Sequence, residues 1–214
     1  MKALKKIISL LLWLFIFYII LNFLIIHFFP IRYEKEIDRV SEELNMDKSL
    51  ILAVIKTESG FDKSAVSSKR AMGLTQVIPE TVLFVSQKYN IEVGVNEIFE
   101  PYTNIRVGML YLKNLIERFG STERAILAYN AGPSVVKKWI DEGLEKFGDN
   151  YDWVPYKETR NYIKKIEKSR RGYEALLSID YRAPEIFHDY YKKIIKFVKS
   201  IKSLDFISDK GENR

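Results

Sequence analysis

The chain has 214 residues, a formal net charge of +6 at pH 7, two histidines and no cysteine. The lack of cysteine excludes a disulfide, a thiolate nucleophile, a cysteine metal site and a lipid-modified N-terminal cysteine, and two histidines argue against a histidine triad or a multi-histidine metal centre. We therefore expect no metal and no cofactor, and any chemistry must use carboxylates, hydroxyls and amides. The positive charge suits membrane lipid or cell-wall polymer, whereas a nucleic-acid partner is not expected because acidic residues interleave the basic ones and no recognition motif is found.

The first segment of the chain is a long apolar stretch, Ile7–Phe29, interrupted only by Ser9, Asn22 and His27. It is long enough for a helix that crosses a bilayer. Lysines come before it, which favours a cytoplasmic N-terminus and a domain outside the membrane. A cleaved signal peptide fits less well, because the stretch is too long for a signal core and no small-x-small cleavage site follows it. Residues 1–33 are therefore predicted to be an uncleaved signal anchor, a single transmembrane helix.

After the anchor, apolar residues recur at helical spacing and no stretch alternates over the length of a strand, which predicts a mainly α domain over residues 34–182. Caps, prolines and glycines mark the helix ends. The predicted helices cover about 37–44, 47–60, 79–89, 105–119, 121–132, 133–140 and 157–177. Residues 91–101 are expected to be irregular. Residues 183–214 are predicted to form a basic amphipathic helix and tail, which docks on its own domain, lies on a membrane or pairs with a partner helix.

The predicted helix that begins after Asp47 and ends before Gly60 carries the main candidate for chemistry. Its apolar face runs through Ile51, Val54 and Ile55, and Glu58 occupies the next position on that face. A carboxylate on a buried face is desolvated, so the pKa of Glu58 should lie above its usual value of about 4.3. A carboxyl group that stays protonated near neutral pH can act as a general acid. The alternative, from this helix alone, is a glutamate at a helix end that points to water.

Four short motifs follow one another along the chain: Glu58-Ser59, Gly73-Leu74-Thr75-Gln76, Ala128-Tyr129-Asn130-Ala131-Gly132 and Glu158-Thr159-Arg160-Asn161-Tyr162. In this order and spacing they resemble the catalytic domain of the soluble lytic transglycosylases, which are lysozyme-like muramidases that cut the bacterial cell-wall glycan. The resemblance covers residues 37–177. One position departs from the family pattern, which usually has Met where this chain has Thr75. We expect that change to alter a contact with the substrate rather than the chemistry.

The resemblance implies an α-rich, lysozyme-like fold with a glycan cleft and one catalytic acid, which falls on Glu58. Ser59 would orient the sugar or the acid, and Tyr162 would form a hydrogen bond near the catalytic carboxylate. The other residues implied to contact the substrate are Thr75, Gln76, Tyr129 and Asn130. Alternatives stay open from the residues themselves: the two tyrosines could be core aromatics, and Asn130 could cap a helix end.

The same resemblance implies a lyase that cleaves peptidoglycan. Glu58 would protonate the glycosidic oxygen between N-acetylmuramic acid and N-acetylglucosamine. It would then take the proton from the muramic acid C6 hydroxyl, which closes on C1 and leaves a 1,6-anhydro end. One acid suffices, since the attacking hydroxyl is already tethered. Two alternatives remain: a hydrolytic muramidase with Asp62 or Glu100 as base, and a non-catalytic scaffold that binds peptidoglycan. The sequence does not predict protein partners.

Overall fold

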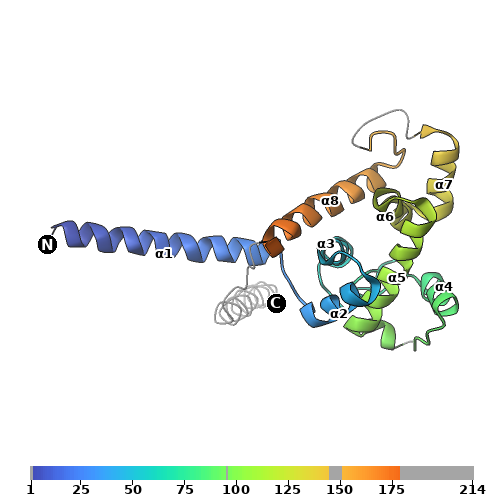
Figure 1. The fold of residues 1–214 in the computed structure, drawn as a ribbon, viewed down its shortest axis with the longest axis horizontal. Coiled ribbons are helices and arrows are strands. Elements are labelled where there is room, and N and C mark those ends of the chain that lie inside the picture. Colours follow the sequence, from blue (N-terminus) through green and yellow to red (C-terminus); the bar gives the residue numbers. More distant parts are fainter. Residues whose placement is uncertain (1, 95, 145–150, 179–214) are drawn as a thin grey trace, which may run out of the picture. The chain divides into compact units, whose positions relative to one another are not determined.

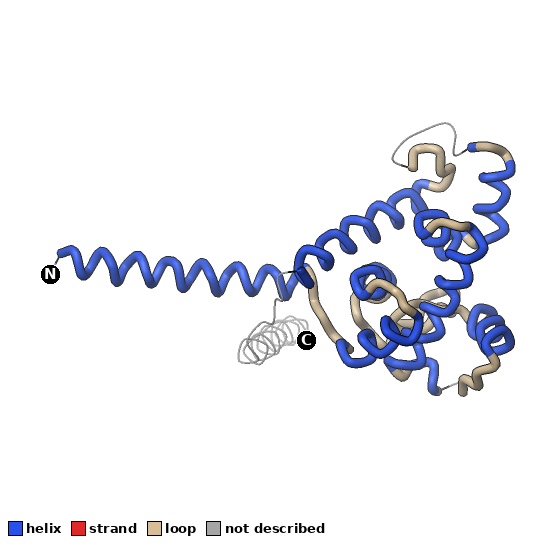
Figure 2. The backbone as a smooth tube through the Cα atoms, viewed as in Figure 1, coloured by secondary structure: helices blue, strands red, loops and turns tan. Residues whose placement is uncertain are grey.

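A computed structural model describes residues 2–94, 96–144 and 151–178. Within these residues the chain forms eight α-helices and one short 3-10 helix, with no strand beyond two isolated backbone bridges (Figures 1 and 2). The fold is mainly α, as the sequence predicts. The contacts divide the chain into two units, one of residues 31–177 and one that contains the N-terminal helix. The helix predicted within 183–214 lies outside the described residues, and the domain boundaries at 33 and 182 stay predictions.

Helix α1 (Lys2–Phe28) is the described part of the N-terminal unit. Its apolar stretch, Leu4–Phe28, has a mean hydropathy of 2.6. Large apolar side chains point outward along it, and Trp13 is 68 % exposed. The polar Asn22 is satisfied within the helix, where its Nδ2 donates to the carbonyl of Tyr18 at 2.7 Å. By length and composition α1 can therefore cross a membrane, as the sequence predicts.

The second unit is built around one long helix. Its elements are α2 (Glu34–Leu44), α3 (Lys48–Glu58), α4 (Pro79–Tyr89), η1 (Glu97–Phe99), α5 (Pro101–Phe119), α6 (Thr122–Ala131), α7 (Pro133–Asp141) and α8 (Lys157–Ser178). Helix α5 contacts α2, α3, α4, α6 and η1. Its side chains Ile105, Met109 and Leu112 are fully buried and recur at helical spacing. The core of the domain therefore lies along α5.

The helices end where the sequence signals them. The side chain of Asp47 caps α3 by accepting a hydrogen bond from the Ser49 N–H at 2.8 Å, and Gly60 follows the helix in the left-handed region. Ser121 caps α6 in the same way. Prolines begin α4, α5 and α7. Residues 91–101 are less irregular than predicted, because they contain η1 and the first residue of α5.

Helix α3 is buried over most of its length. Residues 49–55 are all buried, so α3 exposes little side-chain surface before its last turn. A loop, residues 59–78, then leads to α4 (Figure 2). Within this loop Met72 forms isolated backbone bridges with Val66 and Val77. Packing fixes α3 on several sides, and its C-terminal end is therefore a rigid place from which to present a side chain.

Candidate active site

Glu58 is the last residue of α3, and its side chain is half-buried. Burial raises the pKa of Glu58 to about 7, against the opposing effect of a hydrogen bond from Tyr162. The Tyr162 hydroxyl comes from α8 and donates to Glu58 Oε1 at 2.5 Å. The pKa of Glu58 is therefore shifted upward, as its position on the apolar face of α3 predicts. Near neutral pH a large share of this carboxyl group carries its proton, which is the state that a general acid needs.

The segment 73–76 is tied to the same end of α3. The Ser59 hydroxyl donates to the backbone carbonyl of Leu74 at 2.8 Å and to a carbonyl within α3 at 3.2 Å. Gln76 adopts a left-handed φ of 50°, and its Nε2 donates to two backbone carbonyls of the loop at 3.0 and 3.1 Å. Ser59 and Gln76 therefore shape the loop beside Glu58. Their contacts with a sugar stay predictions.

The structure corrects the prediction for Thr75, whose side chain is expected from the family resemblance to contact the substrate. The side chain is fully buried. Its Oγ1 donates to Asn104 Oδ1 at 2.8 Å, in α5. A Cβ placed on Gly108 would lie 2.4 Å from this Oγ1, so the threonine fills a small space against bare helix backbone. The side chain of Thr75 thus belongs to the core, and only its backbone carbonyl serves the site.

Asn104 is a residue of the site that none of the four sequence motifs contains. Its side chain is 1 % exposed. Its Oδ1 also accepts from the Thr75 N–H at 2.8 Å, while its Nδ2 donates to the carbonyls of Met72 and Ile98 at 3.0 and 2.9 Å. This one amide clamps the 72–75 segment onto α5. The sequence offers one signal: Gly108, inside the same helix, indicates that another segment packs closely against the helix backbone. The partner Thr75 is 29 residues away from Asn104, and no local pattern indicates it.

Tyr129 forms the other side of the site, at the C-terminal end of α6. Its hydroxyl donates to the carbonyl of Thr75 at 2.7 Å. Burial and the charge of Glu58 both raise the pKa of Tyr129, so the two side chains are close enough to interact electrostatically. The Tyr129 ring lies 5.6 Å, centroid to centroid, from that of Tyr111 in α5, which in turn meets Phe84 of α4 at 6.1 Å. An aromatic row therefore leads away from the carboxyl group.

The remaining predicted residues fall into two groups. Tyr162 contacts Glu58 directly through its hydrogen bond to the carboxyl group. Asn130 is exposed, and its Oδ1 accepts from the Thr159 hydroxyl of α8 at 2.8 Å, so α6 and α8 are joined beside the site. The structure thus brings Glu58, Ser59, Tyr129 and Tyr162 together, with Asn130 at the rim.

The two carboxylates considered as a second base are both exposed. Asp62 accepts a hydrogen bond from the Ser64 N–H at 2.9 Å, and Glu100 precedes α5. Burial and the Tyr162 hydrogen bond are the causes that set the pKa of Glu58. Among the described residues no cluster of histidine and acidic side chains could hold a metal ion. The chemistry of the site therefore centres on one carboxyl group and two tyrosine hydroxyls.

The fold and the site define a class of protein, an α-helical domain in which a single carboxyl group with a pKa near neutrality sits among tyrosines. The model of the transglycosylase SLT domain family matches residues 36–151, which is more than half of the chain. The chain belongs to this family.

Curated relatives and solved structures agree with this membership. The chain is 29 % identical over 143 residues to the soluble lytic murein transglycosylase of Salmonella typhimurium, covering 64 % of this chain and 22 % of that protein. It is 32 % identical over 166 residues to membrane-bound lytic murein transglycosylase C of Salmonella paratyphi B, covering 66 % and 46 %. Among solved structures, the 70 kDa soluble lytic transglycosylase of Escherichia coli matches with a TM-score of 0.65 and 27 % identity, over 70 % of this chain and 25 % of that one.

A further solved structure is an inactive glutamate-to-glutamine mutant of the lytic transglycosylase Slt of Pseudomonas aeruginosa, with a TM-score of 0.64 and 28 % identity, over 70 % of this chain and 25 % of that one. The chain therefore spans between about a fifth and a half of the length of these relatives. What they share with it is the domain that holds Glu58, since the family match begins at residue 36.

Proposed function

We propose that this protein is a membrane-anchored lytic transglycosylase that cleaves the β-1,4 bond between N-acetylmuramic acid and N-acetylglucosamine in peptidoglycan and leaves 1,6-anhydro ends. One observation carries the proposal: Glu58 is a single carboxyl group whose pKa is raised to about 7 by burial. Family membership supports it, as do relatives named lytic murein transglycosylases. An inactive relative with glutamine in place of a glutamate is consistent with a catalytic glutamate in this family.

In this proposal Glu58 acts twice. It first donates its proton to the glycosidic oxygen, so the bond to C1 of muramic acid breaks and N-acetylglucosamine leaves as an alcohol. The substrate's own N-acetyl group stabilises the oxocarbenium-like centre. The carboxylate of Glu58 then takes the proton from the C6 hydroxyl as its oxygen bonds to C1. Water is not consumed, and Glu58 ends the cycle protonated.

Tyr162 would adjust the pKa of Glu58, and Tyr129 would form a wall of the site beside it. The Tyr162 hydroxyl donates to Glu58 Oε1 and so favours the carboxylate, which keeps the pKa close to neutrality despite burial. A value near the working pH suits a group that must both give and take a proton. Tyr129 donates to the loop carbonyl of Thr75. We infer that its ring, with Ser59, Gln76 and Asn130, contacts the glycan.

The anchor places this reaction at a membrane. We infer that α1 crosses the membrane once, with the N-terminus in the cytoplasm and the domain outside. Its apolar composition and a relative named membrane-bound support the anchoring, and the lysines that precede the apolar stretch support the orientation. Because the chain has no cysteine, a single introduced cysteine reports its side cleanly. A membrane-impermeant maleimide added to intact cells should label K138C and spare K2C; the reverse pattern would overturn the topology.

The reaction is tested by mass spectrometry of the muropeptides that the full chain, in detergent, releases from purified peptidoglycan. Wild type should release products one water lighter than the reducing sugars, and Glu58→Gln should release them about 10²–10⁴-fold more slowly, because it loses its acid and base. Glu80→Gln is the matched control: Glu80 is an exposed carboxylate, 3.6 Å from Arg70, and its loss should leave the rate unchanged.

Two other outcomes would contradict the proposal. Reducing ends in place of anhydro ends would assign a hydrolase, and Asp62→Asn and Glu100→Gln would then identify its base. Peptidoglycan binding without release, equal in wild type and Glu58→Gln, would assign a scaffold.

A further inference from the structure

The two tyrosine hydroxyls beside Glu58 come from different helices, and a side-chain hydrogen bond joins these helices. Tyr129 lies in the last turn of α6, and Tyr162 lies in the second turn of α8. The Thr159 hydroxyl in α8 donates to Oδ1 of Asn130 in α6 at 2.8 Å. Asn130 follows Tyr129 directly, and Thr159 precedes Tyr162 by three residues. The bond therefore joins α6 and α8 within one helical turn of each tyrosine.

Thr159 is well placed to hold this link. Its side chain is 2 % exposed, and it shares the buried face of α8 with Tyr162, Ile163 and Ile166. Asn130 is exposed, so the link runs from the core to the rim of the site. Apolar packing is not directional, whereas a hydrogen bond between two side chains requires one relative placement of their helices. The Thr159 hydroxyl thus supplies a direction that the apolar residues of α8 do not.

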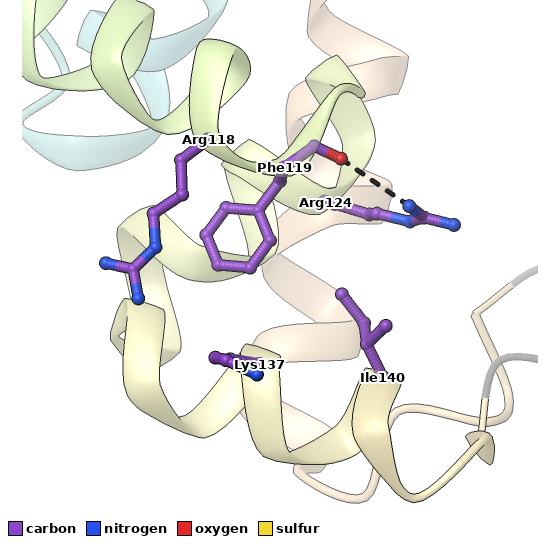
Figure 3. Close-up of a pocket in the computed structure, with 5 residues that line it drawn as sticks. All are labelled: Arg118, Phe119, Arg124, Lys137 and Ile140. Carbon is purple, nitrogen blue, oxygen red and sulfur yellow. Dashed lines mark hydrogen bonds between the residues drawn. The ribbon is translucent and has the colours of Figure 1, made fainter.

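The last turn of α6 is held less firmly than its middle, where residues 125–128 are buried. The last carbonyls of a helix lack partners within the helix, and α6 passes through Gly132 directly into α7. A pocket of about 390 Å³ opens between the end of α5, the start of α6 and α7 (Figure 3). It is lined by Arg118, Phe119, Arg124, Lys137 and Ile140. Packed side chains do not fill this flank of the α6–α7 segment, so a bond to α8 limits its movement.

The groups that face Glu58 from the two helices interact with one another. Burial, and after it the charge of Glu58, raises the pKa of Tyr129 and of Tyr162. Tyr129 also contributes to the raised pKa of Tyr162. Burial raises the pKa of Glu58, and the hydrogen bond that Tyr162 donates at 2.5 Å opposes this effect. A change in the placement of α8 against α6 therefore reaches the acid through Tyr162.

We propose that Thr159 is a positioning residue of the acid site: its hydrogen bond to Asn130 fixes α8 against α6 and so keeps the Tyr162 hydroxyl on Glu58. The inference deepens the proposed function and rests on it, because the placement of Tyr162 matters to catalysis only if Glu58 is the acid. Thr159 acts through Tyr162 and needs no contact with the glycan. Without the bond, the Tyr162 hydroxyl would spend less time on the carboxyl group.

The test observes Glu58 directly and needs no reaction. The side-chain carbon signal of Glu58 is followed in an NMR pH titration of the full chain in detergent, and Glu58→Gln assigns the signal. Thr159→Val removes the hydroxyl at nearly unchanged shape. We expect it to raise the pKa of Glu58 by about half a unit, because a hydrogen bond to the carboxylate is partly lost. Thr159→Ser keeps the hydroxyl and should restore the wild-type value.

Two further variants connect the shift to this bond and to Tyr162. Asn130→Ala breaks the same bond from its exposed side, so it should raise the pKa of Glu58 by a similar amount and add nothing to Thr159→Val. In a chain that carries Tyr162→Phe, Thr159→Val should have no effect. Thr81→Val is the matched control and should leave the pKa of Glu58 unchanged. Thr81 is buried and is the third residue of its helix, as Thr159 is.

The outcomes separate a positioning role from a structural one. An unchanged or lowered pKa of Glu58 in Thr159→Val, in a chain that circular dichroism shows to be folded, would overturn the proposal. A shift that persists in the Tyr162→Phe chain would overturn it too. If Thr159→Val does not fold, Asn130→Ala decides by the same criterion.

The lytic activity is tested separately, by the muropeptides that the wild-type chain releases. Anhydro ends together with an unmoved pKa in Thr159→Val would leave the lytic activity standing while the positioning role fails. A raised pKa in Thr159→Val, with no anhydro ends from wild type, would refute the proposed function and leave the placement of Tyr162 by Thr159 intact.

Discussion

The two ends of α3 carry two acidic residues with opposite properties. Asp47 caps the N-terminal end, and Glu58 is the last residue at the C-terminal end. Burial acts to raise the pKa of both. At Asp47 hydrogen bonds from Ser49 and from Arg170 outweigh it, so the pKa is lowered. At Glu58 the Tyr162 hydroxyl does not outweigh burial, and the pKa rises to about 7.

The difference shows which surroundings raise the pKa of a carboxyl group far enough for it to act as a general acid. Asp47 has a guanidinium partner at 2.8 Å and the positive end of the helix dipole. Glu58 has a neutral donor and lies at the negative end, where a charge is disfavoured. One helix therefore holds a structural carboxylate that is ionised and a functional carboxyl group that is about half protonated at pH 7. The reactive carboxyl group therefore lies at the end of α3 where the helix dipole disfavours its ionised form.

The largest expected effect is on how stability depends on pH. The folded pKa of Glu58 lies above the usual 4.5, so folded chains hold a proton that unfolded chains release. Stability contributed by Glu58 is present below pH 4.5 and is lost as pH rises to about 7. At about 1.4 kcal/mol for each pH unit, the loss amounts to roughly 3 kcal/mol. Glu58→Gln removes it, and the variant should exceed wild type in free energy of unfolding by that amount at pH 8 and match it at pH 4.

Asp47→Asn is the matched control at the other end of the helix, and its sign is reversed. A lowered folded pKa gives stability that is present above the unfolded value of 3.8 and lost as pH falls through the folded pKa. Asp47→Asn should therefore be less stable than wild type at pH 7 and converge with it in acid. Urea unfolding at a series of pH values measures both variants. Parallel curves for Glu58→Gln and wild type would remove the claim that burial keeps Glu58 protonated.

The next effect concerns the loop to which the C-terminal end of α3 is tied. Asn104→Ala leaves the Thr75 N–H and the carbonyl of Ile98 without their buried partner, whereas the Met72 carbonyl still accepts from the Val77 N–H at 3.2 Å. We expect a loss of about 2 kcal/mol in the free energy of unfolding, since each of the two unpaired buried groups costs at least about 1 kcal/mol. Asn114→Ala, on the same helix, removes only an exposed hydrogen bond that Asn114 accepts from Lys88 and should cost less than about 0.5 kcal/mol. Equal losses in the two variants would refute the clamp.

Asn104 also marks the boundary of what local sequence patterns predict. The spacing of apolar residues predicts the helix positions and the burial of Glu58, and residue types such as Asp47 and Ser121 predict the caps. The structure agrees with these predictions. Thr75 was placed at the substrate because its motif suggested a contact, whereas its partner in α5 is 29 residues away. Helical periodicity tells which face is buried, but not which polar groups will meet there.

Tyr162 shows a different limit. It reaches Glu58 across 104 residues of sequence, and no periodicity connects α3 with α8. Only the resemblance to a family placed Tyr162 near the acid.

Tyr162→Phe should sharpen the contrast between the two ends by removing the hydrogen bond that Glu58 accepts from Tyr162. That hydrogen bond lowers the pKa of Glu58, so its loss should raise the pKa by about one unit, given about 1.5 kcal/mol for a hydrogen bond to a charged group. The alkaline limb of the pH–rate profile should move up by the same amount, and the side-chain carbon signal of Glu58 in an NMR titration should follow. Tyr173→Phe, a buried tyrosine on the same helix, is the control. If the alkaline limb of the pH–rate profile stayed in place, the Tyr162 hydrogen bond would not contribute to the pKa of Glu58.

The smallest effect is expected where α3 begins. Asp47→Ala removes the oxygen that accepts from the Ser49 N–H and the partner of Arg170. A helix N-cap contributes about 1 kcal/mol, and a half-exposed ion pair adds only tenths, so the free energy of unfolding should fall by about 1 kcal/mol. The pH–rate profile should stay in place, because α3 is held by its buried residues 49–55 rather than by its cap. A shifted profile would mean that the two ends are coupled through the helix, and the Glu58 end would then owe its raised pKa to more than its own surroundings.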